Sequence, residues 1–178
     1  DSLSVEEIEK SVALFKKNKN SDENSVFSYI ILEEPDKEFV NNFKSGDSFS
    51  RKAKIVGVDS NSKGFEALID LSSEKVVSIV SLSKDAGPTY TMVEIMTAIQ
   101  LTLENEEYQE ALRKRGITDL SLIQIDPWPG GGIVNKNIQK GHRALKTISF
   151  LKESPNDNAY AKPISGLISH VDITDKCV

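Results

Sequence analysis

Cysteine and histidine are scarce in this chain, and their scarcity limits the chemistry that the sequence can support. The 178 residues include one cysteine, Cys177, and two histidines, His142 and His170. One cysteine cannot form an internal disulfide. Neither histidine has a carboxylate or a cysteine at ligand spacing, and both are interpreted as ordinary residues of a sheet. The sequence therefore predicts no metal site and no cofactor in this chain.

An excess of positive charge and long apolar runs are also missing. Lys and Arg number 22 against 27 Asp and Glu, a formal net charge of -5. Nucleic acid and anionic membranes bind basic surfaces, so neither is expected as the main partner. No apolar run approaches the roughly 20 residues that span a bilayer, and the first four residues do not resemble a signal peptide. The sequence also has no Asn-x-Ser/Thr sequon, and this absence, together with the single cysteine, favours a cytoplasmic or peroxisomal location over secretion.

The residue sets of common enzyme sites are absent as well. There is no Gly-x-Ser-x-Gly elbow for a nucleophile. The run Gly130-Gly131-Gly132 is followed by no Lys-Ser/Thr pair and no helical pattern, so it is predicted to be a flexible turn. The carboxylates between Glu104 and Glu110 are interpreted as the solvated face of a helix, with Glu110 able to pair with Lys114. The chain therefore shows no catalytic site of its own.

The sequence does contain the patterns of helices and strands. In the first half, a capping box of Ser4 and Glu7 opens a helix over about residues 4–18. Strands are expected at residues 26–32, 53–58, 65–71 and 76–82, with a short helix after Asp36. One face of the third strand is predicted to be buried, because it carries the apolar residues Phe65, Ala67, Ile69 and Leu71.

A similar order of elements follows a linker at residues 84–88. Thr91 and Glu94 repeat the capping box, and apolar residues recur along the helix up to residue 103. Asn105 begins a second helix, which Gly116 ends by adopting the left-handed conformation. Strands are expected at residues 120–125, 144–151 and 164–173. The second half is thus predicted to resemble the first.

The only tryptophan, Trp128, lies between Pro127 and Pro129. Proline lacks a backbone donor and has a fixed φ, so the preceding strand is expected to end in a turn that holds the indole in place. A tryptophan held in this way is interpreted either as a packing anchor in the core or as a contact for a ligand.

The ends of the two halves are also alike. Residues 69–77 read strand, Asp, apolar residue, Ser turn, Lys and next strand, and residues 171–178 follow the same order. We therefore predict an α+β protein of two consecutive small domains, residues 1–86 and 87–178. Each is a helix on an antiparallel sheet of about four strands, similar to cystatin. The strand after Lys176 is cut off at Val178, so we expect this chain to be an excerpt of a longer protein.

Several motifs, in order along the chain, resemble the second and third N-terminal domains of copper amine oxidases. They are residues 3–8 (Leu-Ser-Val-Glu-Glu-Ile), 115–119 (Arg-Gly-Ile-Thr-Asp), 126–128 (Asp-Pro-Trp), 141–143 (Gly-His-Arg) and 157–167, from Asp157 to Leu167. The resemblance covers almost the whole chain. Lys162 stands where the family more often has His or Arg, and His142 where Arg is common.

The resemblance implies a parent enzyme that oxidises primary amines to aldehydes, ammonia and hydrogen peroxide with O2, copper and topaquinone. That chemistry needs three imidazole ligands and an Asn-Tyr-Asp/Glu precursor, neither of which this chain has. The catalytic domain is then expected outside this sequence, in a parent homodimer. In the family the accessory domains pack on the catalytic domain, and the third contributes to the amine channel, for which Trp128 and Tyr160 are the candidates here. The alternative is that Tyr160 packs between domains and Trp128 in the core.

Two other functions are compatible with the residues alone. The first is an independent protein with duplicated cystatin-like domains that inhibits or scaffolds a partner, although the Gln-x-Val-x-Gly loop of such inhibitors is absent. The second is an unrelated small enzyme, which the missing residue sets disfavour. The leading hypothesis is a non-catalytic fragment of a primary amine oxidase that is inactive alone.

Overall fold

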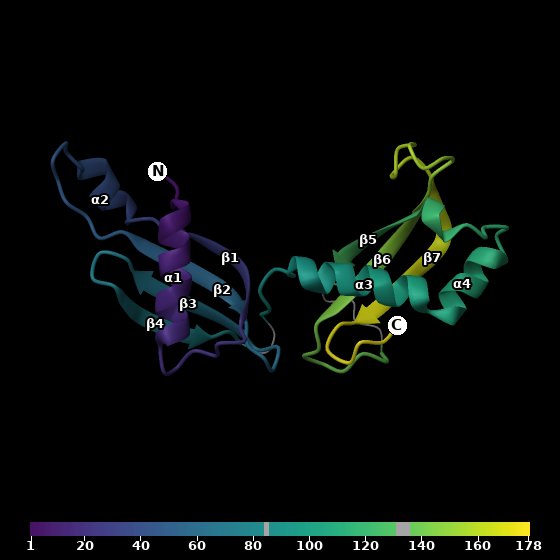
Figure 1. Ribbon diagram of the computed structural model, residues 1–178, viewed down its shortest axis with the longest axis horizontal. Helices are drawn as coiled ribbons and strands as arrows, with labels where there is room; N and C mark the ends of the chain where they lie inside the picture. The colour runs from purple at the N-terminus through teal and green to yellow at the C-terminus, as the bar shows by residue number, and fades with distance from the viewer. Residues whose placement is uncertain (84–85, 131–135) are drawn as a thin grey trace. The chain divides into compact units, whose positions relative to one another are not determined.

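The computed structural model describes residues 1–83, 86–130 and 136–178 and divides into two compact units, Asp1–Thr89 and Tyr90–Val178. In each unit a helix lies across one face of an antiparallel sheet (Figure 1). The predicted α+β class is therefore confirmed. Parts of the predicted linker and glycine turn, Lys84, Asp85, Gly131 and Gly132, lie outside the described residues.

The N-terminal unit begins with the predicted helix. α1 (Val5–Lys17) opens with a capping box, in which Ser4 Oγ accepts the Glu7 N–H at 3.2 Å and Glu7 Oε2 accepts the Ser4 N–H at 2.9 Å. The other elements are β1 (Val26–Glu33), α2 (Lys37–Asn42), β2 (Lys52–Val58), β3 (Gly64–Asp70) and β4 (Lys75–Ser81). The strands pair in the order β1-β2-β3-β4, all antiparallel, as the predicted meander requires.

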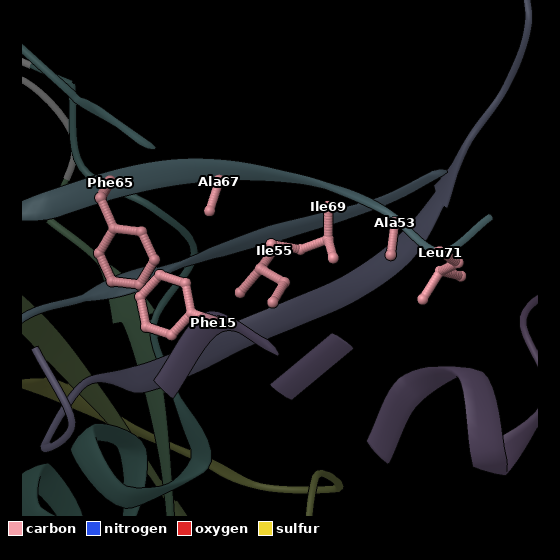
Figure 2. Packing of buried hydrophobic residues seen from close by; sticks show 7 residues of the cluster. All are labelled: Phe15, Ala53, Ile55, Phe65, Ala67, Ile69 and Leu71. Carbon is pink, nitrogen blue, oxygen red and sulfur yellow. The ribbon is translucent and has the colours of Figure 1, made fainter. Parts of the chain in front are cut away.

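The core of this unit lies between α1 and the sheet. Phe15 of α1 is 1% exposed, and its ring stacks on Phe65 of β3 with centroids 5.1 Å apart. Figure 2 shows these rings beside the aliphatic side chains that line the same face of β2 and β3. Phe65, Ala67, Ile69 and Leu71 are all buried, so the predicted face is confirmed. Burying a side chain as large as Phe65, Ile69 or Leu71 contributes about 1.5–3 kcal/mol.

The C-terminal unit has two helices whose ends match the sequence signals. α3 (Met92–Glu104) starts with the capping box of Thr91 and Glu94. α4 (Glu106–Arg113) starts at Asn105, whose side chain accepts the Tyr108 N–H at 2.9 Å. Gly116 follows α4 with φ +76, and the next N–H donates back to the Leu112 carbonyl at 3.0 Å. This is the predicted glycine-ended helix.

The sheet of this unit has the three strands expected before the truncated one, and it differs from the prediction in two respects. Among the described residues these strands are β5 (Ile123–Pro129), β6 (Ala144–Leu151) and β7 (Pro163–Asp172), in the order β5-β6-β7. Leu120–Leu122 form a short 3-10 helix rather than the start of β5. β5 also continues through Pro129 instead of ending in a turn. Because β5 is an edge strand of this three-stranded sheet, the missing N–H groups of Pro127 and Pro129 can fall on its unpaired side.

Hydroxyl pairs join the helices to the middle strand of this sheet. The Tyr108 hydroxyl lies 2.8 Å from Ser149 Oγ, and Thr102 Oγ1 lies 3.3 Å from Thr147 Oγ1. All four side chains are buried among apolar residues such as Leu112. These polar groups are satisfied by one another, so the helix and strand are held in one register.

Candidate functional site

Trp128 lies on β5 with 51% of its surface exposed, so the interpretation as a core anchor is wrong. Its Nε1 donates to Asp126 Oδ2 at 2.7 Å, which fixes the indole on the sheet. Alternation along β5 buries Ile123 and Ile125 on the helix side and places Trp128 on the opposite face. We call this the open face of the C-terminal sheet.

Tyr160 lies in the β6–β7 connection and is 54% exposed. Its ring meets the Phe150 ring edge-on, with centroids 5.2 Å apart and planes at 70°. Phe150 alternates with the buried Ser149 on β6, so its ring belongs to the open face. Tyr160 is therefore exposed to solvent, while one side of its ring packs against Phe150.

The structure places the two channel candidates on one face but not in contact. Trp128 is opposite Lys146 on β6, and Tyr160 packs at Phe150, four positions further along the same strand. Four residues of strand span about 13 Å. The two rings thus belong to an extended surface and do not form a single aromatic pair.

The sequence repeat corresponds to a repeated turn at the ends of β3 and β7. Asp70 Oδ1 accepts the N–H groups two and three residues later, both at 2.9 Å, and Asp172 Oδ1 does the same at 2.9 and 3.1 Å. Four residues after each aspartate the chain has a positive φ, 56 at Glu74 and 54 at Lys176. The pairing Asp172↔Cys177 has the same spacing as Asp70↔Lys75 in the first unit. That a full strand follows Cys177 stays a prediction.

An arginine in each unit binds the glutamate of the capping box. Arg51 Nε donates to Glu7 Oε1 at 2.6 Å, and Arg143 Nη2 donates to Glu94 Oε2 at 3.0 Å. The Arg143 guanidinium also lies 4.3 Å from the centroid of the Tyr90 ring. Burial alone raises the pKa of Glu94, but hydrogen bonds from Arg143 and from the helix start outweigh it and lower the pKa below 4.5.

The residue before each of these arginines contacts the turn aspartate of its unit. This residue is a serine in the first unit and a histidine in the second. Ser50 Oγ donates to Asp70 Oδ2 at 2.8 Å in the first unit. In the second, His142 Nδ1 lies 2.7 Å from Asp172 Oδ2 and 3.7 Å from Asp175 Oδ2. The hydrogen bond with Asp172 raises the pKa of His142 above 6.5, and the charges of both carboxylates act in the same direction.

His142, Asp172 and Asp175 are therefore a group that could hold a metal ion, with ligand atoms within 4.8 Å of one another. The absence of a carboxylate near His142 in the sequence was misleading, because the carboxylates come from a turn about 30 residues away in sequence. A signal was nevertheless present. Aligning Ser50-Arg51 with His142-Arg143 in the repeat places His142 beside the turn aspartate.

The fold and these repeated turns define a pair of related α+β domains. The model of the copper amine oxidase N2 domain matches residues 1–82, and that of the N3 domain matches residues 93–178. The chain belongs to the copper amine oxidase family and has its second and third N-terminal domains. The predicted resemblance is confirmed.

Relatives in the family include two bacterial enzymes. The chain is 30% identical to a primary amine oxidase of Arthrobacter sp. (strain P1) over 97% of this chain and 26% of the relative. It is 31% identical to a primary amine oxidase of Klebsiella aerogenes over 99% of this chain and 23% of the relative. The chain thus spans about a quarter of the relatives that it matches.

The fold of a solved structure agrees with this assignment. A copper-containing benzylamine oxidase from Hansenula polymorpha matches 99% of this chain and 28% of its own, with a TM-score of 0.76 and 17% identity. At this identity the match supports the fold alone. No helix in the described ranges is long and apolar enough to cross a membrane.

The residues of this chain do not fit the copper and topaquinone that the family implies. Three imidazoles are needed, and the chain has two histidines. His142 is paired with Asp172, whereas His170 lies on β7 opposite Lys146. None of the four tyrosines lies in the precursor context. These residues supply neither the three imidazoles nor the tyrosine precursor that this chemistry needs.

Proposed function

We propose that this chain is the non-catalytic N-terminal part of a primary amine oxidase, with residues 1–86 and 87–178 as its two accessory domains. The parent would oxidise primary amines to aldehydes, ammonia and hydrogen peroxide with copper and topaquinone, as a homodimer. The observation that carries this proposal is the match of two successive domain models along a chain that spans a quarter of its relatives. The role of the accessory domains is to pack on the catalytic domain.

An exposed apolar surface on the N-terminal unit supports such packing. Phe39 and Val40 of α2 lie with Phe43 and Phe49, and all four are between 38% and 52% exposed. The Phe43 ring is 5.8 Å from Phe39 and 5.9 Å from Phe49, centroid to centroid. Contiguous exposed aromatic side chains often mark an interaction surface. We assign this α2 aromatic surface to contact with another part of the parent.

The open face of the C-terminal sheet supports a role in the amine channel. Trp128 and Tyr160 are half exposed, yet the hydrogen bond to Asp126 and the ring of Phe150 hold them in place. Held rings lose little conformational entropy when they contact an organic amine. An ammonium group over such a ring gains about 1 kcal/mol by cation-π attraction.

The substitution Tyr160→Ala in the full-length oxidase tests the channel role. We expect the ratio of kcat/KM between a bulky aromatic amine and methylamine to change by about fivefold, because 1 kcal/mol corresponds to that factor. Copper content should be unchanged. Tyr29→Ala, an exposed tyrosine of the other unit, is the matched control. Equal kinetics of the Tyr160 variant and the unmodified oxidase across small and bulky amines would count against the role.

A further inference from the structure

Three side chains able to bind a metal ion converge at the end of β7. His142 Nδ1 lies 2.7 Å from Asp172 Oδ2 and 3.7 Å from Asp175 Oδ2. The three ligand atoms are all within 4.8 Å of one another. Two ligands that share a cation at bond lengths of about 2.1 Å lie roughly 3–4 Å apart. The two distances from His142 are close to this range, and the exposed Asp175 has room to adjust.

The turn itself does not require these side chains. The N-terminal unit builds the same turn with Asp70, where Ser50 takes the place of His142 and Ser73 the place of Asp175. In both units the third residue after the aspartate donates its backbone N–H to the aspartate Oδ1. The imidazole and the second carboxylate are therefore additions to a turn that forms with serines.

We propose that His142, Asp172 and Asp175 bind a divalent transition-metal cation, for which Zn²⁺ is the representative ion. The cation takes the place of the proton between His142 Nδ1 and Asp172 Oδ2, with the imidazole neutral. Asp172 Oδ1 remains bound to the two N–H groups of the turn. These hydrogen bonds hold the carboxylate in position for the ion, as partners of metal ligands do elsewhere.

The donor set selects the class of ion. Ca²⁺ and Mg²⁺ prefer oxygen ligands alone, whereas imidazole with carboxylates suits zinc and its first-row neighbours. Two carboxylates and a neutral imidazole carry a charge that a divalent cation cancels. Asp172 is 4% exposed and His142 18%, while Asp175 is 56% exposed. The site is thus anchored on a buried side and reached from solvent, where water completes the coordination.

The presence of only two histidines makes a direct test by NMR possible. Zn²⁺ is titrated into the chain carrying Cys177→Ser, so that the exposed thiol cannot bind the ion. We expect saturation at one equivalent, with the imidazole signals of His142 shifted and those of His170 unchanged. No shift at His142, or equal shifts at both histidines, overturns the proposal.

Calorimetry on variants in the same background measures the contribution of each ligand. His142→Ser reproduces the arrangement of Ser50 in the other unit, and Asp175→Asn keeps the backbone N–H of the turn. Each should weaken Zn²⁺ binding at least about tenfold, the smallest effect typical even of a partner of a metal ligand. His170→Ala should bind Zn²⁺ with the same affinity as the chain that carries only Cys177→Ser. Unchanged affinity in both ligand variants contradicts the site.

Discussion

Arg143 binds Glu94 at the first turn of α3, and the same carboxylate accepts the Thr91 N–H at 2.8 Å as part of the capping box. One glutamate thus caps the helix and fixes the chain that enters β6. Arg51 and Glu7 repeat the contact in the N-terminal unit. The Arg51–Glu7 pair is the more exposed of the two. Its side chains are 25% and 26% exposed, against 9% and 12% for Arg143 and Glu94.

This difference in burial predicts unequal effects of removing the two arginines. Arg143→Met leaves the carboxylate of Glu94 in a mostly buried site, and we expect the free energy of unfolding of its unit to fall by about 3 kcal/mol. Arg51→Met should cost about 1 kcal/mol or less, since that pair is better solvated. Urea unfolding followed by NMR signals of each unit measures both. Equal losses would show that burial does not set the strength of these pairs.

Glu94 also predicts a dependence of stability on pH. Its pKa is lower in the folded chain than the ordinary 4.5, because hydrogen bonds from Arg143 and Thr91 outweigh the effect of burial. The folded state therefore binds fewer protons, and the stabilisation is present above pH 4.5 and lost as pH falls through the lower folded pKa. In Glu94→Gln the acid-induced loss of stability of this unit should be shallower. Glu110→Gln, on the solvated face of α4, is the control, and a slope that Glu94→Gln leaves unchanged would contradict the assignment.

The packing of Phe15 predicts a large effect in the N-terminal unit. Its ring is 1% exposed and contacts both Phe65 and Phe27, so Phe15→Ala should cost about 3–5 kcal/mol in the free energy of unfolding. Phe39→Ala removes the same ring from a position that is 38% exposed and should cost far less. Thermal unfolding compares the two variants. Similar midpoints would argue against α1 as the centre of this core.

Local signals in the sequence predicted most of the fold. Both capping boxes, the glycine after α4 and the buried face of β3 depend on residues close in sequence, and all are present in the structure. The predicted end of β5 was wrong. The free-energy cost of a proline in a strand depends on whether the strand lies at the edge of its sheet, and the periodicity of the sequence does not reveal this.

The candidate sites were harder to predict because they also depend on how distant segments of the chain pack together. The exposure of Trp128 depends on the face of β5 that the helices leave open, and the neighbours of His142 come from a distant turn. The repeat in the sequence identifies one part of this site, the aspartates at 70 and 172. The residues that contact these aspartates, Ser50 and His142, are found only when the segment before β2 is aligned with the segment before β6.

The central claim is that these two domains support an oxidation whose reacting groups lie elsewhere in the parent enzyme. Hydrogen peroxide release is the most direct measurement: the purified chain is incubated with Cu²⁺, O2 and benzylamine or methylamine beside the full-length oxidase. We predict sustained release from the full-length enzyme and none above the protein-free blank from this chain. Turnover by the isolated chain, in proportion to bound copper, would contradict the account.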